Sequence, residues 1–447
     1  MIMTKQLKLG LFLPELGQHF AAWRHPSVKK DHILNFKHVT KLAQQAEAAK
    51  FDAIFLADWM AIGERNETFE QNAALNFEPI TLLSALASIT EKIGLIGTVS
   101  TTYNEPFNVA RQFASLDHIS NGRVGWNIVT STGLDVAKNF GISRELPHSE
   151  RYNRADEFVD ITKKLWDSWE DDAVVFDQAG ARYLNPEKVH EVKVDGDWLS
   201  IDGTLTIARP PQGYPVLVQA GSSDTGKEIA AKTAEVVFTA WQTLEEAQAF
   251  YSDVKGRLAK YGRQPDELKI MPGIYPIVGR TEEEAKQKHA ELQALIPERL
   301  GVAKLSANFG VDLTGYDVDG PLPDLPDESS INGIKSRFTL LKDLADRENL
   351  TIRQLYERTA GARGHKEVIG TPQQISDLLE EWFTNGAADG FNIMPAVVPD
   401  GLTDFVELVI PELQKRGLFK TDYTGETLRD HLQLKRPQNQ FTAVAVK

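Results

Sequence analysis

Short apolar segments rich in β-branched residues alternate with longer segments of helical periodicity along most of this chain. Such alternation is typical of successive βα units, in which helices cover a parallel sheet. Strands buried on both faces read as nearly continuous apolar runs. We expect eight of them, at residues 8–14, 51–57, 93–101, 124–131, 215–220, 236–240, 270–278 and 390–394. Helices are predicted at residues 39–49, 80–89, 107–119, 150–169, 371–383 and 402–416.

Right-handed βα crossovers in this number either close into a barrel or form a doubly wound open sheet. The open sheet normally carries a Gly-x-Gly-x-x-Gly turn after its first strand, whereas residues 14–19 here read Pro-Glu-Leu-Gly-Gln-His. We therefore expect an α/β fold of the (β/α)8 or TIM barrel type, with residues 1–447 in one domain. Residues 297–367 interrupt the alternation of strand and helix segments with Gly-, Pro- and Asp-rich sequence. We interpret them as an insertion within the barrel that forms a lid.

The composition excludes several classes of function. The formal net charge of −14 argues against a nucleic-acid partner and an anionic membrane surface, both of which require a basic face. No window approaches the ~20 apolar residues of a membrane helix, and residues 1–10 do not resemble a signal peptide. The chain has no cysteine, which excludes disulfides and thiolate chemistry and fits a reducing compartment. A cytoplasmic enzyme is the simplest expectation.

Two polar residues of the predicted strands are candidates for function. Asp58 ends the second strand, which places it where barrel enzymes keep their functional groups, and its alternative role is a helix or loop cap. Asn127 lies within Trp-Asn-Ile-Val-Thr-Ser, on the opposite strand face from Thr130. A buried amide costs free energy unless it is hydrogen-bonded. Asn127 is therefore either a structural hydrogen-bond hub or a ligand contact, and both roles stay open.

Two helix starts have the composition of anion sites, because a helix N-terminus offers free N–H groups and a positive dipole end. His148, Arg151 and Tyr152 surround one of them, for which Ser149 is the expected N-cap. The other follows Gly221, Ser222 and Ser223 after the fifth strand. The alternatives are a capped surface helix and an ordinary βα turn.

No metalloprotease His-Glu-x-x-His motif, no other metal-ligand pattern and no serine-hydrolase elbow occurs. Trp23, Trp59 and Trp126 lie near the expected barrel mouth, where they either line a flat ligand or belong to the core. A lysine-dependent barrel lyase is disfavoured, since no lysine ends predicted strands two to five.

Several segments together resemble the bacterial-luciferase-like flavin monooxygenases, in particular the branch of nitrilotriacetate, EDTA and dibenzothiophene-sulfone monooxygenases. The resemblance covers nearly the whole chain. It is carried by residues 22–26 (Ala-Trp-Arg-His-Pro), 51–58, 115–131, 150–157, 219–223 (Gln-Ala-Gly-Ser-Ser), 387–391 (Ala-Ala-Asp-Gly-Phe) and 427–431 (Thr-Leu-Arg-Asp-His).

The resemblance implies a two-component monooxygenase. It would receive reduced FMN from a separate NAD(P)H:flavin reductase and use O2 to oxygenate a small molecule, with cleavage of a C–S or C–N bond in a sulfone, thioether or aminocarboxylate. It also implies a homodimer or homotetramer. Two rival interpretations are a deazaflavin-dependent dehydrogenase of the same superfamily and a non-catalytic flavin-binding protein.

The resemblance assigns roles to seven residues. Asp58 and Thr98 would contact the flavin, and Asn127 would lie near the isoalloxazine as the candidate catalytic residue. The remaining four, at the two helix starts, would bind the cofactor and its phosphate: His148, Tyr152, Ser222 and Ser223.

Overall fold

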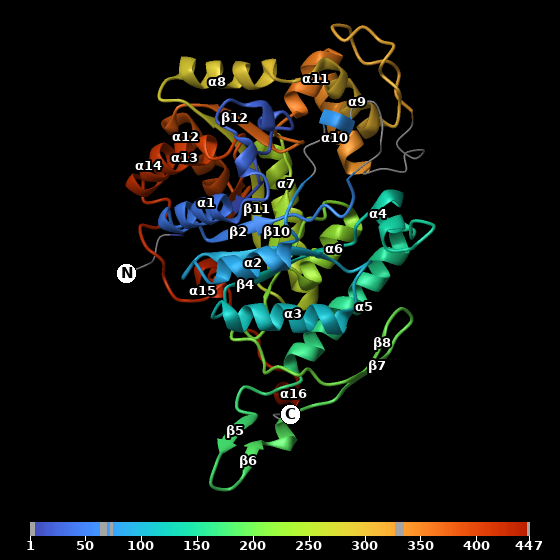
Figure 1. The fold of residues 1–447 in the computed structure, drawn as a ribbon, viewed down its shortest axis with the longest axis vertical. Coiled ribbons are helices and arrows are strands. Elements are labelled where there is room, and N and C mark those ends of the chain that lie inside the picture. Colours follow the sequence, from blue (N-terminus) through green and yellow to red (C-terminus); the bar gives the residue numbers. More distant parts are fainter. Residues whose placement is uncertain (1–4, 63–68, 72–74, 327–334, 445–447) are drawn as a thin grey trace.

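Eight parallel strands close into a barrel surrounded by helices (Figure 1), as the sequence predicts. The computed structural model describes residues 5–62, 69–71, 75–326 and 335–444. In barrel order the strands are β1 (Lys8–Phe12), β2 (Ala53–Leu56), β3 (Gly94–Ser100), β4 (Val124–Val129), β9 (Val216–Gln219), β10 (Val236–Thr239), β11 (Lys269–Val278) and β13 (Gly390–Ile393). The barrel closes because β10 pairs with β11, β11 with β13, and β13 with β1.

Helices pack their apolar stripes on the outside of this barrel. Several begin where the sequence places a cap: Asn35 accepts hydrogen bonds from the first turn of α1, and Thr371 caps α12. The principal helices are α1 (Phe36–Ala48), α2 (Pro79–Ala87), α3 (Pro106–Ile119), α5 (His148–Asp167), α6 (Asp224–Thr233), α7 (Leu244–Arg257), α12 (Pro372–Thr384), α13 (Asp400–Asp404) and α14 (Ile410–Lys415).

One local prediction is wrong. Ser149 does not cap α5, because that helix already begins at His148 and Pro147 precedes it without a side-chain cap. Trp126 belongs to the core, one of the two roles left open for it, since its ring faces outward and packs against Phe113 and Trp166 of the covering helices. Strand alternation explains this, because Asn127 next to it faces inward.

The expected insertion at residues 297–367 is largely helical. It holds α9 (Glu298–Phe309), α10 (Lys335–Glu348) and α11 (Ile352–Thr359), which share their own apolar core. Its last two residues open a strand that the sequence did not predict, β12 (Lys366–Gly370), which pairs with the second half of β11. These helices and α8 (Glu282–Ala294) lie together at one end of the molecule in Figure 1.

The stretch from 170 to 214 also contains structure that the sequence did not reveal. Two antiparallel hairpins project from the barrel in Figure 1, β5–β6 and β7–β8. Their strands are β5 (Val174–Asp177), β6 (Arg182–Leu184), β7 (Val192–Asp195) and β8 (Ser200–Gly203). A short helix, α4 (Leu134–Asn139), follows β4 and lies near one end of α5 in Figure 1.

The C-terminal segment closes the N-terminal end of the barrel. Helix α15 (Leu428–Leu432) inserts Leu428 beside Gly94, where no Cβ would fit. Leu432 lines a small internal cavity of about 20 Å³ in the barrel. The opposite end, where the strands finish, is therefore the open mouth. Within the described residues, no helix is long and apolar enough to cross a membrane.

Candidate active site at the barrel mouth

Three phenylalanines form an apolar floor below the mouth. Phe12, Phe55 and Phe238 face inward from β1, β2 and β10, with ring centroids 5.1, 5.4 and 5.8 Å apart. His365 stacks on Phe238 at 4.8 Å, with the two rings 14° from parallel. Gly273 of β11 makes room for this imidazole, since a Cβ there would collide with it. The three rings are inclined to one another by 49° to 83°, so the floor is aromatic and apolar without being flat, and it suits an aromatic ligand packed against ring edges and faces.

Asn127 lies beside this floor in a fixed orientation. Its Nδ2 donates to Thr98 Oγ1 at 2.8 Å, and Thr98 Oγ1 donates to the Leu56 carbonyl oxygen at 2.7 Å. Asn127 is 3% exposed, and its Oδ1 has no hydrogen-bond partner in the described protein. Buried polar atoms are nearly always paired, so this acceptor indicates a ligand donor. The Thr98 hydroxyl thereby holds the Asn127 amide in one orientation.

Asp58 follows β2 at the rim of the mouth. Burial raises the pKa of its carboxyl to about 6, with a smaller contribution from the negative charge of Glu78, and the Trp59 N–H lowers it. Glu78 is held in place as the N-cap of α2, where it accepts from Ile80 and Thr81 N–H groups. A carboxyl that titrates near neutral pH in a cleft is a functional-site candidate.

This pKa predicts a pH-dependent stability difference for Asp58→Asn. The folded-state pKa lies above the unfolded value, so wild type loses stability as pH rises from about 4 to about 6. Asparagine does not titrate, and Asp58→Asn should gain about 1 to 2 kcal/mol relative to wild type at pH 8 compared with pH 4. Denaturant unfolding at both pH values measures this. A pH-independent difference would contradict the raised pKa.

The turn after β9 has the features of a phosphate site. Gly221 crosses Gly226 so closely that a Cβ on Gly221 would lie 3.0 Å from the Gly226 Cα. Ser223 Oγ accepts from the Gly226 N–H at 3.1 Å and thereby caps α6. Within the described residues, the Asp224 and Thr225 N–H groups have no acceptor. The turn is therefore an ordinary capped βα turn that also presents two backbone N–H groups to an anion.

The second predicted anion site lies one helix away. The rings of His148 and Tyr152 lie in the first turns of α5 with centroids 4.5 Å apart and planes tilted by 36°. Among the described residues, the Tyr152 hydroxyl bonds no protein group. Lys232 of α6 pairs with Asp156 of α5 at 2.7 Å, one turn beyond Tyr152, which ties the two helices together. Arg151 is directed elsewhere, since it binds Glu145 and the Leu146 carbonyl.

A segment before β12 crosses the rim of the mouth. Phe20 N–H donates to the Ala360 carbonyl at 3.0 Å, and His365 reaches the floor, so residues 360–365 run from the outer wall into the barrel. Midway, the Arg363 guanidinium lies 5.7 Å from the centroid of the Trp59 ring. Trp59 is 60% exposed at the rim and Trp23 is 40% exposed, so both are surface side chains and neither belongs to the core.

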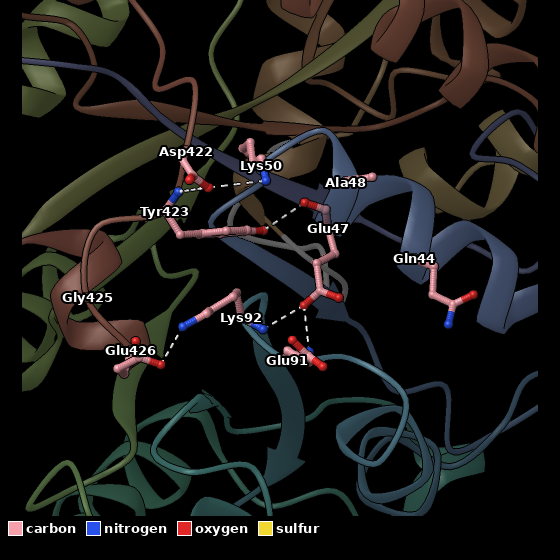
Figure 2. Close-up of a pocket in the computed structure, with 10 residues that line it drawn as sticks. All are labelled: Gln44, Glu47, Ala48, Lys50, Glu91, Lys92, Asp422, Tyr423, Gly425 and Glu426. Atoms are coloured by element: carbon pink, nitrogen blue, oxygen red, sulfur yellow. Dashed lines mark hydrogen bonds and ion pairs between the residues drawn. The ribbon is translucent and has the colours of Figure 1, made fainter.

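A larger surface pocket lies at the opposite end and does not belong to this site. Figure 2 shows its lining charges paired with one another or with backbone. Lys50 binds Asp422 at 3.3 Å, Lys92 binds Glu426, and Glu47 accepts backbone N–H groups from Glu91 and Lys92. The cleft is about 500 Å³, and both of its lysines are paired with carboxylates. Its role is to fasten the C-terminal segment beneath the barrel.

Comparison with known proteins identifies the family. Residues 16–389 match the luciferase-like monooxygenase family. The chain belongs to this family. It is 50% identical over 438 residues to N-acetyl-S-(2-succino)cysteine monooxygenase of Bacillus subtilis (strain 168), with 98% of each chain covered. It is also 50% identical over 447 residues to nitrilotriacetate monooxygenase component A of Aminobacter aminovorans, again with 98% of each covered.

A solved structure of a riboflavin lyase with modified FMN and riboflavin superposes on this luciferase-like monooxygenase with a TM-score of 0.84. The sequences are 31% identical, and 97% of each chain is covered. The protein is thus an enzyme, a monooxygenase of the luciferase-like family. Within the described residues, no group of side chains could hold a metal ion.

Sequence reasoning missed the aromatic floor, His365 and Arg363. Strand alternation was the available indication for the floor, because Phe12, Phe55 and Phe238 sit on the inward positions of their strands. Nothing local marks residues 360–365, which reach the mouth only through the long connection after α11.

Proposed function

We propose that this luciferase-like monooxygenase uses reduced FMN, delivered by a separate NAD(P)H:flavin reductase, to oxygenate a small organic substrate. Asn127 supports this most directly, because its buried Oδ1 has no partner among the described residues and the barrel below the mouth is lined with aromatic rings. The family supports it independently, since one relative at 50% identity is named as component A of its system. When bound, reduced FMN supplies the electrons with which one oxygen atom of O2 enters the substrate and the other becomes water.

The chain's own residues bind and orient. The floor of Phe12, Phe55 and Phe238 excludes water below the ring plane. Asn127 Oδ1 accepts an N–H of the ring system, and Thr98 keeps the amide from rotating. Asp58 holds a proton for part of the time at neutral pH, because its pKa is about 6. Ser222, Ser223, His148 and Tyr152 bind the phosphate end.

The substrate is a small anionic compound whose C–S or C–N bond is cleaved after oxygenation. The two relatives at 50% identity are named for N-acetyl-S-(2-succino)cysteine, a thioether, and nitrilotriacetate, a tertiary amine. Both compounds carry three carboxylates. We place this enzyme with such substrates in the cytoplasm, in keeping with a chain that has no cysteine.

A reductase-dependence assay tests the proposal. The purified chain should not oxidise NADH alone, because its sequence has no dinucleotide fingerprint. With FMN and a generic flavin reductase, it should consume O2 and convert at least one of three probes: N-acetyl-S-(2-succino)cysteine, nitrilotriacetate or dibenzothiophene sulfone. The reductase and FMN without the chain serve as the control.

Two results would contradict this function. NADH-driven turnover by the chain alone would show that no reductase is needed. Reduction of a deazaflavin, with no O2 uptake coupled to any probe, would favour the dehydrogenase of the same superfamily. Binding of FMN without any turnover would instead indicate a flavin-binding protein.

A further inference from the structure

A small cavity lies inside the barrel, between the C-terminal helix α15 and the aromatic floor. Its volume is about 20 Å³. Leu432 of α15 lines it on one side, and Phe55 and Phe238 of the floor line it on the side of the mouth. A single water needs roughly 10 to 15 Å³. The cavity therefore has room for one diatomic molecule and none for an organic substrate.

The cavity exists because adjacent strands carry small residues at one level of the barrel. Gly10, Ala53 and Gly94 are register partners on β1, β2 and β3, whereas barrels usually fill their interior with bulky branched side chains. Leu428 of α15 fills the space beside Gly94, but Gly10 and Ala53 still line the cavity. Voids in a packed core are unfavourable, because the atoms around them lose contacts. A void directly below an active site is therefore a candidate ligand site.

The lining of the cavity favours an apolar occupant over water. Among the described residues that line it, only Asp52 and Asn392 are polar. The Asp52 carboxylate is already engaged, because it accepts the Leu9 N–H at 2.7 Å and also binds the Lys420 ammonium. Asn392 is 4% exposed, and its Oδ1 has no partner in the described protein. One amide cannot supply the roughly three hydrogen bonds that a buried water makes.

We propose that this cavity binds O2 and supplies it to the mouth. O2 is the co-substrate of a monooxygenase, and as a small apolar molecule it is more stable in an apolar cavity than in water. Phe55 and Phe238 belong both to the cavity lining and to the floor, so this pair of rings separates the bound O2 from the mouth. Core side chains change rotamers, and a diatomic molecule needs only a small opening between the rings. The inference depends on the monooxygenase class and not on the identity of the flavin or of the organic substrate.

Nuclear relaxation by dissolved O2 tests the site without flavin or turnover. O2 is paramagnetic and accelerates the relaxation of nearby methyl protons. Met271 lines the cavity and is 6% exposed. In the full chain with isotope-labelled methionine methyl groups, the Met271 methyl should relax faster under O2 than under argon. Met394 is the control within the same spectrum, since it is 1% exposed and packs beside Gly273, outside the cavity lining, and its methyl should change less.

Filling the cavity should abolish this effect. Val236 lines the cavity, whereas Val237, the next residue of β10, packs outward against α6 and α7. Val236→Ile adds one methylene to the cavity, and Val237→Ile is the matched control with the same change on the other face of the strand. Only Val236→Ile should remove the O2-dependent relaxation of Met271. Ala53→Val, from the opposite wall of the barrel, repeats the test if thermal melting shows that Val236→Ile does not fold.

Rapid mixing with O2 connects the cavity to catalysis. In the chain loaded with reduced FMN, Val236→Ile should lower the second-order rate constant for the reaction with O2 severalfold. The FMN dissociation constant should stay unchanged, because the substitution lies below the floor and not at the mouth. Val237→Ile should alter neither quantity.

The outcomes separate this inference from the proposed function. Equal relaxation of the Met271 and Met394 methyls in wild type overturns the O2 site, and so does a selective effect on Met271 that survives both filling substitutions. A rate constant for O2 that is unchanged in a folded variant without the relaxation effect overturns the supply of O2 from the cavity. Selective relaxation that Val236→Ile removes, with no organic probe oxygenated, supports the O2 site and refutes the proposed function.

Discussion

Replacing Tyr152 with phenylalanine should weaken FMN binding by about tenfold to a hundredfold and leave riboflavin binding nearly unchanged. The variant removes one hydroxyl that no protein group engages among the described residues, so nothing structural is lost with it. A hydrogen bond to a charged acceptor contributes about 1.5 to 3 kcal/mol, which sets this range. Riboflavin lacks the phosphate and therefore reports the ring and sugar contacts alone.

The serines of the β9 turn provide the second arm of this test. Ser222→Ala should behave as Tyr152→Phe does. Ser223→Ala should lose FMN affinity and should also unfold at a lower temperature, because Ser223 Oγ caps α6. Tyr183→Phe, in the projecting β6 strand, is the matched control with an exposed tyrosine. Equal weakening of FMN and riboflavin would mean that these residues shape the mouth generally. Unchanged binding of both would move the phosphate elsewhere.

The eight barrel strands could be predicted because their signal is local. Each buries both faces, so its own composition marks it, as in β3 from Gly94 to Ser100. β12 could not be found in this way, since it begins inside a polar connection and is stabilised only by pairing with β11. The exposed hairpin β5–β6 has no buried face and therefore no periodic apolar pattern. Ser149 failed as a cap because Pro147 takes the N-cap position two residues sooner.

The same difference between local and long-range signals decides which site residues could be predicted. Asp58 and Asn127 could be selected from sequence because Asp58 follows a predicted strand and Asn127 is an amide within an otherwise apolar one. Their properties could not, because the pKa of Asp58 depends on its burial and on Glu78, and the orientation of the Asn127 amide depends on Thr98. Arg363 reaches Trp59 only through the long connection after α11. Contacts of this range leave no local trace in one sequence.

The largest loss of stability should come from the base of the barrel, at Arg429→Met. Arg429 is 2% exposed and binds Glu235 through two nitrogens, at 2.5 and 2.9 Å. It also donates to the carbonyl oxygens of Tyr214 and Lys435. These bonds lock α15 under β9 and β10. Removing the guanidinium leaves the largely buried Glu235 carboxylate without its cationic partner, which costs about 3 to 5 kcal/mol.

Denaturant unfolding of wild type, Arg429→Met, Glu235→Gln and the double variant would measure that cost. We expect the double variant to recover part of the loss, because the carboxylate left without its partner is then neutral. Lys435→Met is the control from the same segment, since Lys435 is 76% exposed and lies 3.5 Å from Glu267. It should change stability by less than about 1 kcal/mol.

FMN binding by the same variants tests whether the two ends of the barrel are independent. Because α15 and the mouth lie at opposite ends of the barrel, folded Arg429→Met should bind FMN as wild type does. If Arg429→Met had the same unfolding midpoint as Lys435→Met, Arg429 would not stabilise the base of the barrel. If Arg429→Met also lost FMN affinity, the two ends of the barrel would be coupled.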